Sequence, residues 1–216
     1  MVCAILARVQ ASHRFLEGRV ALISGAGRGC GEAVALALAA AGAKVCASDI
    51  NPDRANRVAE QIRTSGGEAF GWQTDVSNKL QVGTLIETVR DRFTRLDIVV
   101  NHAHVNPRAP LLTLDEWEWR RTLDVNLTGA FFVAQLAARV MSDEGGGTIL
   151  LLLKSIPEEL AGSGWGAQAA STAGLISLAN ALDIDNKDRG VHVEAVESDN
   201  PDATAMKVVD RLKQAA

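Results

Sequence analysis

Six short aliphatic runs alternate with six longer helical stretches from Arg19 onward, and this alternation constrains the fold more than any other feature of the sequence. The runs are rich in β-branched and other aliphatic residues, and the stretches between them carry helix-start signals such as Pro52 after Asn51. Repeated strand–helix units of this kind build a parallel sheet with helices on both faces. The sequence therefore predicts a doubly wound α/β fold.

The positions of the runs predict the individual elements. The expected strands cover Val20–Ser24, Lys44–Asp49, Glu68–Thr74, Leu96–Asn101, Thr148–Leu153 and Val191–Val196. The expected helices cover Cys30–Ala41, Pro52–Thr64, Asn78–Phe93, Asp115–Met141, Ala167–Asn186 and Ala203–Gln214. The uninterrupted leucines at 151–153 are typical of a central strand that is buried on both faces.

Length and charge limit the domain count and the partners. The chain has 216 residues, of which 47% are hydrophobic and 22% charged, enough for one sizeable core. We expect a single domain over residues 16–216, preceded by an N-terminal extension over residues 1–15. The formal net charge is -4 and the two signs are interspersed, so neither nucleic acid nor a membrane surface is an expected partner.

The N-terminus and the cysteines bear on the compartment. Arg8 interrupts the apolar opening stretch before it reaches the length of a secretory signal, and no run approaches the roughly 18 apolar residues of a membrane helix. Cys3, Cys30 and Cys46 are odd in number and lack the spacing of metal ligands. These features predict reduced thiols, a cytoplasmic protein and no metal site.

The first expected strand leads into a glycine-rich loop, Ser24-Gly25-Ala26-Gly27-Arg28-Gly29-Cys30-Gly31, and an alanine-rich helix follows at once. Gly25, Gly29 and Gly31 allow a tight turn, close backbone approach to a pyrophosphate and close packing of helix on strand. The helix N-terminus adds unpaired N–H groups and a positive dipole end. A flexible turn has the same composition, but the position between strand and helix indicates a Rossmann-type dinucleotide site.

Asp49 ends the second expected strand, 24 positions after Gly25, where a carboxylate can accept hydrogen bonds from the adenosine ribose. The same carboxylate would repel a 2′-phosphate. Arg28 argues for NADP, because a guanidinium in this loop can pair with that phosphate. We give Asp49 more weight and predict NAD as the cofactor, with Cys30 as a small apolar member of the loop and not a redox group.

Further segments, from residue 16 to about 196, resemble the short-chain dehydrogenase/reductase family. Leu16–Gly25 is similar to the family's entry strand and glycine motif, and Asp75-Val76 to its adenine-contacting pair. Asn101-His102-Ala103-His104 stands where the family has Asn-Asn-Ala-Gly, so only Asn101 and Ala103 match. Asp124–Gly129 resembles the segment with the family's catalytic asparagine, here Asn126. The resemblance implies an oxidoreductase fold that binds the dinucleotide through these positions.

The resemblance also implies where the family's catalytic serine, tyrosine and lysine fall. Aligning on Ala173-Gly174 places them at Ser155, Gln168 and Thr172. The spacing is kept, but glutamine replaces the tyrosine and threonine replaces the lysine. A phenol beside an ammonium group can pass a proton to the substrate oxygen, whereas an amide beside a hydroxyl cannot. Because the sequence contains no tyrosine, general acid–base help worth roughly 10²–10⁴ in rate is expected to be missing.

Three other side chains are candidate substitutes for the phenol and the ammonium group. Lys154 precedes Ser155 on one strand, and neighbouring strand residues point to opposite faces, so both should not enter the site. His102 and His104 lie near the cofactor by resemblance, and histidine is suited to proton transfer at neutral pH. Loop packing or a backbone hydrogen bond is the more ordinary role for both.

The C-terminal part departs from the family. Glu197-Ser198-Asp199-Asn200-Pro201 stands in place of a Pro-Gly turn, and one short helix follows. We expect a minimal substrate-covering region and a sixth strand at the sheet edge, which a partner chain can cover. The helices that include Phe131 and Leu175 correspond to the family's dimer-forming pair, so the resemblance implies a homo-oligomer.

Three functions remain open. The favoured one is an NAD(H)-binding regulatory, sensing or non-catalytic subunit, in a homo-oligomer or a mixed oligomer with an intact relative. The second is an active oxidoreductase on a small carbonyl or alcohol, which uses Ser155 and Asn126 with a water or a histidine in place of the phenol. The third is a structural protein without dinucleotide, against which Gly25, Gly29 and Asp49 argue.

Overall fold

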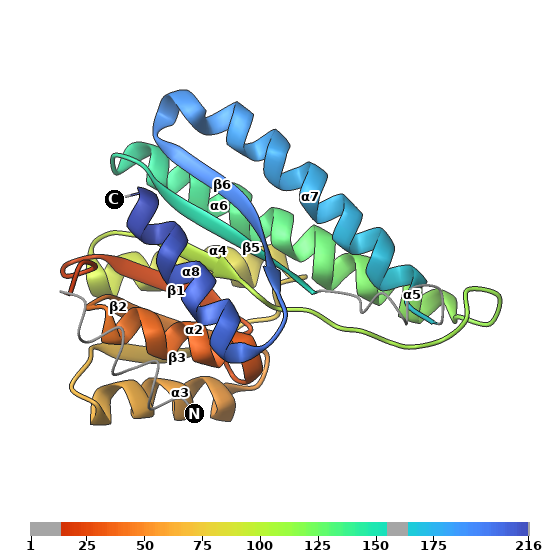
Figure 1. The fold of residues 1–216 in the computed structure, drawn as a ribbon, viewed down its shortest axis with the longest axis horizontal. Helices are drawn as coiled ribbons and strands as arrows, with labels where there is room; N and C mark the ends of the chain where they lie inside the picture. The colour runs from red at the N-terminus through yellow and green to blue at the C-terminus, as the bar shows by residue number, and fades with distance from the viewer. Residues whose placement is uncertain (1–13, 155–163, 216) are drawn as a thin grey trace.

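The structure is a computed structural model that describes residues 14–154 and 164–215. Its six strands form one parallel sheet in the order β3-β2-β1-β4-β5-β6 (Figure 1). The strands are β1 (Val20–Ser24), β2 (Lys44–Asp49), β3 (Ala69–Gln73), β4 (Ile98–Asn101), β5 (Gly147–Lys154) and β6 (Val191–Ser198). The predicted Rossmann-type doubly wound fold is confirmed.

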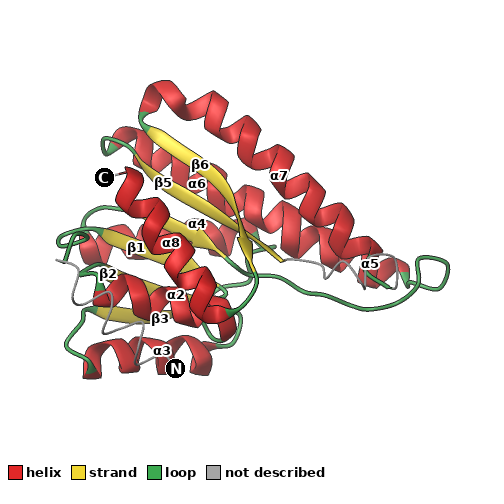
Figure 2. Cartoon of the chain, viewed as in Figure 1, coloured by secondary structure: helices red, strands yellow, loops and turns green. Residues whose placement is uncertain are grey.

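The helices cover both faces of this sheet (Figure 2). They are α2 (Gly29–Ala40), α3 (Pro52–Thr64), α4 (Lys79–Phe93), α5 (Glu116–Leu123), α6 (Gly129–Asp143), α7 (Gly166–Asn186) and α8 (Pro201–Ala215). Helices α2, α3 and α8 pack on one face, and α4, α6 and α7 pack on the other. In β5, Leu152 joins the first core whereas Leu151 and Leu153 join the second, so the strand is buried on both faces as predicted.

The last helix begins two residues earlier than expected. Asn200 caps it, because its side-chain oxygen accepts a hydrogen bond from the Ala203 backbone N–H at 2.9 Å. Pro201 then occupies the first helical position, where a proline costs no hydrogen bond. The third and fourth strands are also shorter than expected and begin at Ala69 and Ile98.

The helix expected over Asp115–Met141 is present as one helical run over residues 116–143, but it is not α-helical throughout. α5 ends at Leu123, and a π-helical turn over Asp124–Thr128 separates it from α6. The turn carries the buried side chain of Asn126, which bonds both backbone groups of Val105. A single wider turn leaves the apolar period of the flanking helices almost unchanged, so the sequence pattern does not reveal it.

The strand order places a crevice at one edge of the sheet. β1 lies between β2 and β4, and the connections after β1 and β4 leave in opposite directions. Sheets of this topology bind ligands at that point, beyond the carboxyl ends of the strands. β6 is the last strand of the described sheet on its side. Within the described ranges, no helix is both long and apolar enough to cross a membrane.

Candidate functional site

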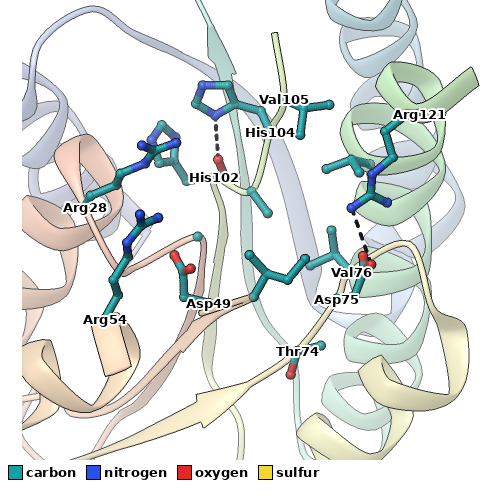
Figure 3. Close-up of a pocket in the computed structure, with 14 residues that line it drawn as sticks. Arg28, Asp49, Arg54, Thr74, Asp75, Val76, His102, His104, Val105 and Arg121 are labelled. Carbon is teal, nitrogen blue, oxygen red and sulfur yellow. Dashed lines mark hydrogen bonds and ion pairs between the residues drawn. The ribbon is translucent and has the colours of Figure 1, made fainter. Parts of the chain in front are cut away.

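A cleft lies beyond the carboxyl ends of the central strands (Figure 3). Its lining residues are Gly25, Arg28, Asp49, Ile50, Arg54, Thr74, Asp75, Val76, His102, Ala103, His104, Val105, Arg121 and Val125. Six of these were assigned to a dinucleotide from the sequence, namely Gly25, Arg28, Asp49, Asp75, Val76 and Ala103. The fold therefore brings residues from four separate loops to one cleft.

The loop after β1 has no space for a side chain at several of its glycines, Gly31 and Gly25 among them. A Cβ on Gly31 would lie 2.2 Å from the carbonyl oxygen of Gly25, so α2 could not approach the loop. Gly25 has a φ of +67°, and a Cβ there would lie 2.7 Å from the backbone nitrogen of Ala103. Gly29 also has a positive φ, but nothing lies within 4 Å of the position of its Cβ. The backbone of this loop is thus bare at the N-terminus of α2.

Asp49 is fixed beside the loop by two backbone donors. Its carboxylate accepts hydrogen bonds from the backbone N–H groups of Gly27 and Asn51, each at 3.0 Å. The residue is only 8% exposed, and a Cβ on Gly27 would lie 2.6 Å from the carboxylate oxygen. The acid therefore has one orientation at the end of β2, facing the cleft.

Two further residues that line this end were not identified from the sequence. Arg54 lies beside Asp49 and Arg28 in the cleft (Figure 3). It belongs to the first turn of α3, whose N-cap Asn51 follows β2 directly, and this spacing from the strand end was the available signal. Ile50 is 54% exposed and offers an apolar surface to a flat ring.

Asp75 and Val76 line the opposite side of the cleft. Asp75 accepts hydrogen bonds from the backbone and side chain of Ser77 and lies 3.4 Å from a guanidinium nitrogen of Arg121. Partial burial opposes ionisation of Asp75, but the hydrogen bonds and the charge of Arg121 outweigh it and hold the carboxyl pKa below its usual range. Arg121 comes from α5, so no spacing in the sequence linked it to Asp75.

The loop after β4 contributes two histidines. Asn101 is buried and accepts a hydrogen bond from the Ser24 hydroxyl at 2.5 Å, which joins the ends of β4 and β1. His102 is 8% exposed, and burial lowers its pKa to about 3, with the nearby positive charges of His104, Lys154 and Arg28 adding to the effect. His104 is more exposed. Its pKa is also lowered, by desolvation in the surrounding protein and by the positive charges of Lys154 and Arg28.

Asn126 and Gln168, two of the family-matched catalytic positions, are joined in a buried polar network. The Asn126 amide donates to the backbone oxygen of Val105 at 2.9 Å and to the Gln168 side-chain oxygen at 3.2 Å. The Gln168 amide nitrogen in turn donates to the Thr172 hydroxyl at 3.1 Å. Asn126 and Gln168 are each 2% exposed. Ser155, the fourth expected member, lies outside the described residues.

Cys30 is buried in the core beneath α8 and does not line the cleft. Its sulfur accepts a long hydrogen bond from the Thr204 hydroxyl at 3.6 Å, so this loop position serves the packing of α8 on α2. Among the described residues, no group of three or more His, Cys, Asp or Glu side chains has the geometry of a metal site.

The residues present fit a nicotinamide dinucleotide. Gly25 and Gly31 leave no room for side chains, so the loop backbone and the α2 N-terminus face any bound phosphate. Asp49 and Ile50 stand at the end of β2, where an adenosine ribose and an adenine require an acceptor and an apolar surface. Gly25, Arg28, Gly29, Gly31 and Asp49 would hold the adenosine diphosphate part.

Comparison with known proteins agrees with this fit. A family model described as short chain dehydrogenase matches residues 19–214. A 3-oxoacyl-[acyl-carrier-protein] reductase from Synechocystis is 35% identical over 182 residues, which cover 84% of this chain and 73% of that protein. A 7alpha-hydroxysteroid dehydrogenase from Escherichia coli is 31% identical over 84% of this chain and 70% of its own length.

Solved structures also superpose on most of this chain. A short chain dehydrogenase from Mycobacterium smegmatis superposes with a TM-score of 0.85 at 27% identity, covering 91% of this chain and 86% of that one. A 7 alpha-hydroxysteroid dehydrogenase complexed with NADH and 7-oxo glycochenodeoxycholic acid superposes with a TM-score of 0.79 at 31% identity, covering 86% and 72%.

Proposed function

Because the chain belongs to the short-chain dehydrogenase family of oxidoreductases, we propose that it binds NAD(H) but lacks the family's tyrosine-dependent proton transfer. The proposal has two parts that rest on different residues. Binding rests on the glycine loop and Asp49, and the loss of proton transfer rests on Gln168 and Thr172. The predicted cytoplasmic location and single-domain organisation remain part of this proposal.

The preference for NAD over NADP rests on Asp49. Its carboxylate is held at the ribose end of the cleft by two backbone N–H groups, and a 2′-phosphate placed there would meet a fixed negative charge. Arg28 and Arg54 line the same end and would moderate this repulsion. We therefore expect NADH to bind measurably more tightly than NADPH, but not to the exclusion of NADPH.

The observation that carries the second part is the closed hydrogen-bond network around Gln168. Both polar atoms of its amide are occupied, one by Asn126 and one by Thr172, and the side chain is buried. A bound nicotinamide ring supplies a hydride donor or acceptor, but the amide can neither release nor take up the accompanying proton. The side chains at these positions thus maintain the packing of α7 against the π-helical turn.

The test is a titration with NADH and NADPH followed by a hydride-transfer assay on ketones and alcohols. We expect saturable NADH binding, weaker NADPH binding, and no turnover above the uncatalysed rate. Asp49→Asn should narrow the difference between the two cofactors, because it removes the charge that repels the 2′-phosphate. Robust ketone reduction by the wild-type protein would contradict the second part, and absence of binding to either cofactor would contradict the first.

A double substitution separates a lost reaction from a lost scaffold. Gln168→Tyr with Thr172→Lys restores a phenol four residues before an ammonium group on one helical face of α7. If the remaining site is competent, reduction should rise by about 10²-fold or more over the wild type. The single Thr172→Lys variant is the control, because it adds the charge without the phenol.

One observation favours a second candidate, an active oxidoreductase with a histidine as proton donor. His104 Nδ1 lies 2.9 Å from the backbone oxygen of His102, and a carbonyl only accepts, so Nδ1 carries the hydrogen. The other ring nitrogen then has a free lone pair, so it can accept a proton from a small alcohol in the cleft and, once protonated, return it to a carbonyl. Under this candidate, His104→Gln would abolish a wild-type activity that Gln168→Ala leaves in place.

The proposed assembly is a homo-oligomer, or a mixed oligomer with an intact relative. α6 carries apolar side chains that are only partly buried against the core, Phe132, Leu136 and Val140 among them. These residues lie on the helix that corresponds to the family's dimer-forming pair. Light scattering on the purified chain, alone and with an intact relative, distinguishes the two assemblies.

A further inference from the structure

Arg57 joins the glycine loop to helices α2 and α3 from outside the cleft. Its guanidinium donates to both carboxylate oxygens of Glu32, at 2.7 and 2.9 Å, and to the backbone oxygen of Gly27 at 2.9 Å. Arg57 belongs to α3 and Glu32 to the first turn of α2, so one side chain connects two helices and the loop that precedes α2. Arg54, one turn earlier in α3, lines the cleft, whereas Arg57 is not one of the described residues that line it.

The contacts of Arg57 fix direction more than they add stability. Arg57 and Glu32 keep 46% and 23% of their side-chain surface exposed, so the ion pair alone contributes little to the stability of the fold. The planar guanidinium, however, presents its N–H groups in a rigid fork. The fork is bidentate to the carboxylate, and one of its nitrogens also reaches the Gly27 oxygen. Arg57 therefore fixes the Gly27 carbonyl relative to the first turn of α2.

Gly27 links this contact to the acid at the end of β2. The Gly27 N–H donates to the Asp49 carboxylate at 3.0 Å and the Gly27 carbonyl accepts from Arg57, so both backbone polar groups of the glycine are held. The residue is also confined sterically, because a Cβ on Gly27 would lie 2.6 Å from the Cβ of Arg54. Asp49 accepts its second backbone hydrogen bond from Asn51. Release of the Gly27 carbonyl would therefore loosen one of the two donors that orient Asp49.

From this geometry we propose that Arg57 is a positioning residue for the preference between the two dinucleotides. The clamp, formed by Arg57, Glu32 and Gly27, holds the Gly27 N–H where it orients Asp49, and Asp49 in turn disfavours a 2′-phosphate. The inference rests on the proposed function, because it requires that Asp49 face the adenosine ribose. It assigns the geometry of the loop and its acid to a side chain that lies outside the cleft.

A double substitution, Glu32→Gln with Arg57→Gln, removes the clamp without changing the net charge of the chain. In titrations followed by tryptophan fluorescence, NADH binding should weaken by about tenfold, as expected for the loss of hydrogen bonds to a charged group. The ratio of the NADPH to the NADH dissociation constant should fall by about threefold or more, because a less firmly held Asp49 repels the 2′-phosphate less. A merely structural defect would weaken the binding of both cofactors equally and leave this ratio unchanged.

Glu60→Gln with Arg63→Gln is the matched control on the same helix. Arg63 pairs with Glu60 and donates to the backbone oxygen of Ala69 at 2.9 Å, so the two double substitutions remove the same kinds of contact. Ala69 lies at the amino end of β3, and the glycine loop lies at the carboxyl end of β1 in the same parallel sheet. The control should therefore keep both the NADH affinity and the ratio. Arg57→Lys retains the charge without the fork and should lie between the wild type and the clamp variant.

A measurement on the cofactor-free chain separates this inference from the proposed function. Hydrogen exchange of the Gly27 amide, followed by NMR, should be faster in Glu32→Gln with Arg57→Gln than in the wild type or the control. Normal NADH binding by the wild type, together with unchanged Gly27 exchange or an unchanged cofactor ratio in the clamp variant, would overturn the inference alone. A wild type that binds neither cofactor, but whose Gly27 exchange still depends on the clamp, would overturn the proposed function and leave the link from Arg57 to Gly27 in place.

Discussion

At the scale of single residues, the burial of His102 links folding to pH. Its pKa is about 3 in the folded chain, whereas a histidine in the unfolded chain titrates near the ordinary value of about 6.5. Between these values the unfolded chain binds a proton that the folded chain does not. The free energy of unfolding should therefore be unaffected above pH 7 and should fall as the pH drops below about 6.5.

The size of this effect can be measured by urea unfolding between pH 7 and 5. We expect the contribution of His102 to approach about 1.4 kcal/mol lost per pH unit well below 6.5. His102→Asn, which restores the residue found in the family motif, should flatten the profile over this range. His192→Asn removes an exposed histidine and is the control. A profile of equal slope in wild type and His102→Asn would contradict the assigned pKa.

At the scale of elements, Asp97 ties the amino ends of β1 and β4 together. Its carboxylate accepts hydrogen bonds from the Val20 N–H at 2.9 Å and Arg19 at 2.8 Å, and it also pairs with Arg95. Burial opposes ionisation of Asp97, but these partners outweigh it and hold its pKa below the usual range. This stabilisation is complete above about pH 4, the unfolded value, and is lost as the pH falls through the lower folded value.

Asp97→Asn should lower the free energy of unfolding at pH 7 by about 2 kcal/mol, since hydrogen bonds to a charged group are lost from a buried position. The variant should also lose less stability than the wild type on acidification from pH 4 to pH 2. Denaturant titrations at both pH values measure this difference. Asp91→Asn removes a carboxylate from the exposed face of α4 and should change little. Equal acid sensitivity of wild type and Asp97→Asn would refute the assignment.

A second prediction at the scale of elements concerns the close contact between the glycine loop and α2. Gly31→Ala would bring a methyl group to 2.2 Å from the Gly25 oxygen, so the loop must move and NADH binding should be lost or greatly weakened. The expected loss of stability is about 1–3 kcal/mol. Gly83→Ala is the contrasting variant, because nothing lies near that position in α4 and alanine favours a helix.

Thermal unfolding with and without NADH measures both variants. Gly83→Ala should be as stable as the wild type or more stable, and it should keep the shift that NADH produces. A Gly31→Ala protein that binds NADH normally would show that the loop tolerates a side chain at this position.

At the scale of the whole molecule, the sequence predicted the sheet better than the site. The six strands were recognisable because strands buried on both faces, such as the leucine-rich β5, are apolar at almost every position. The glycine loop and Asp49 were recognisable because their chemistry lies within or close to one strand–helix unit. Both kinds of signal are local in the chain.

The remaining features depend on contacts between distant segments. Arg121 meets Asp75 across 46 positions, and Asn126 meets Gln168 across 42. The π-helical turn was also missed, because one wider turn barely changes the apolar period and the partner of its Asn126 side chain, Val105, lies in another loop. Spacing along a helix or strand contains no information about such partners, so only the folded structure identifies them.

Gly25 touches the backbone of Ala103 with no side chain between them, and this bare contact makes the two loops mechanically continuous. Because closely packed atoms transmit strain, we expect a displacement of the glycine loop to reach the segment that bears the histidines. A spectroscopic label placed on the histidine segment would thus report whether a ligand occupies the glycine-loop side of the cleft.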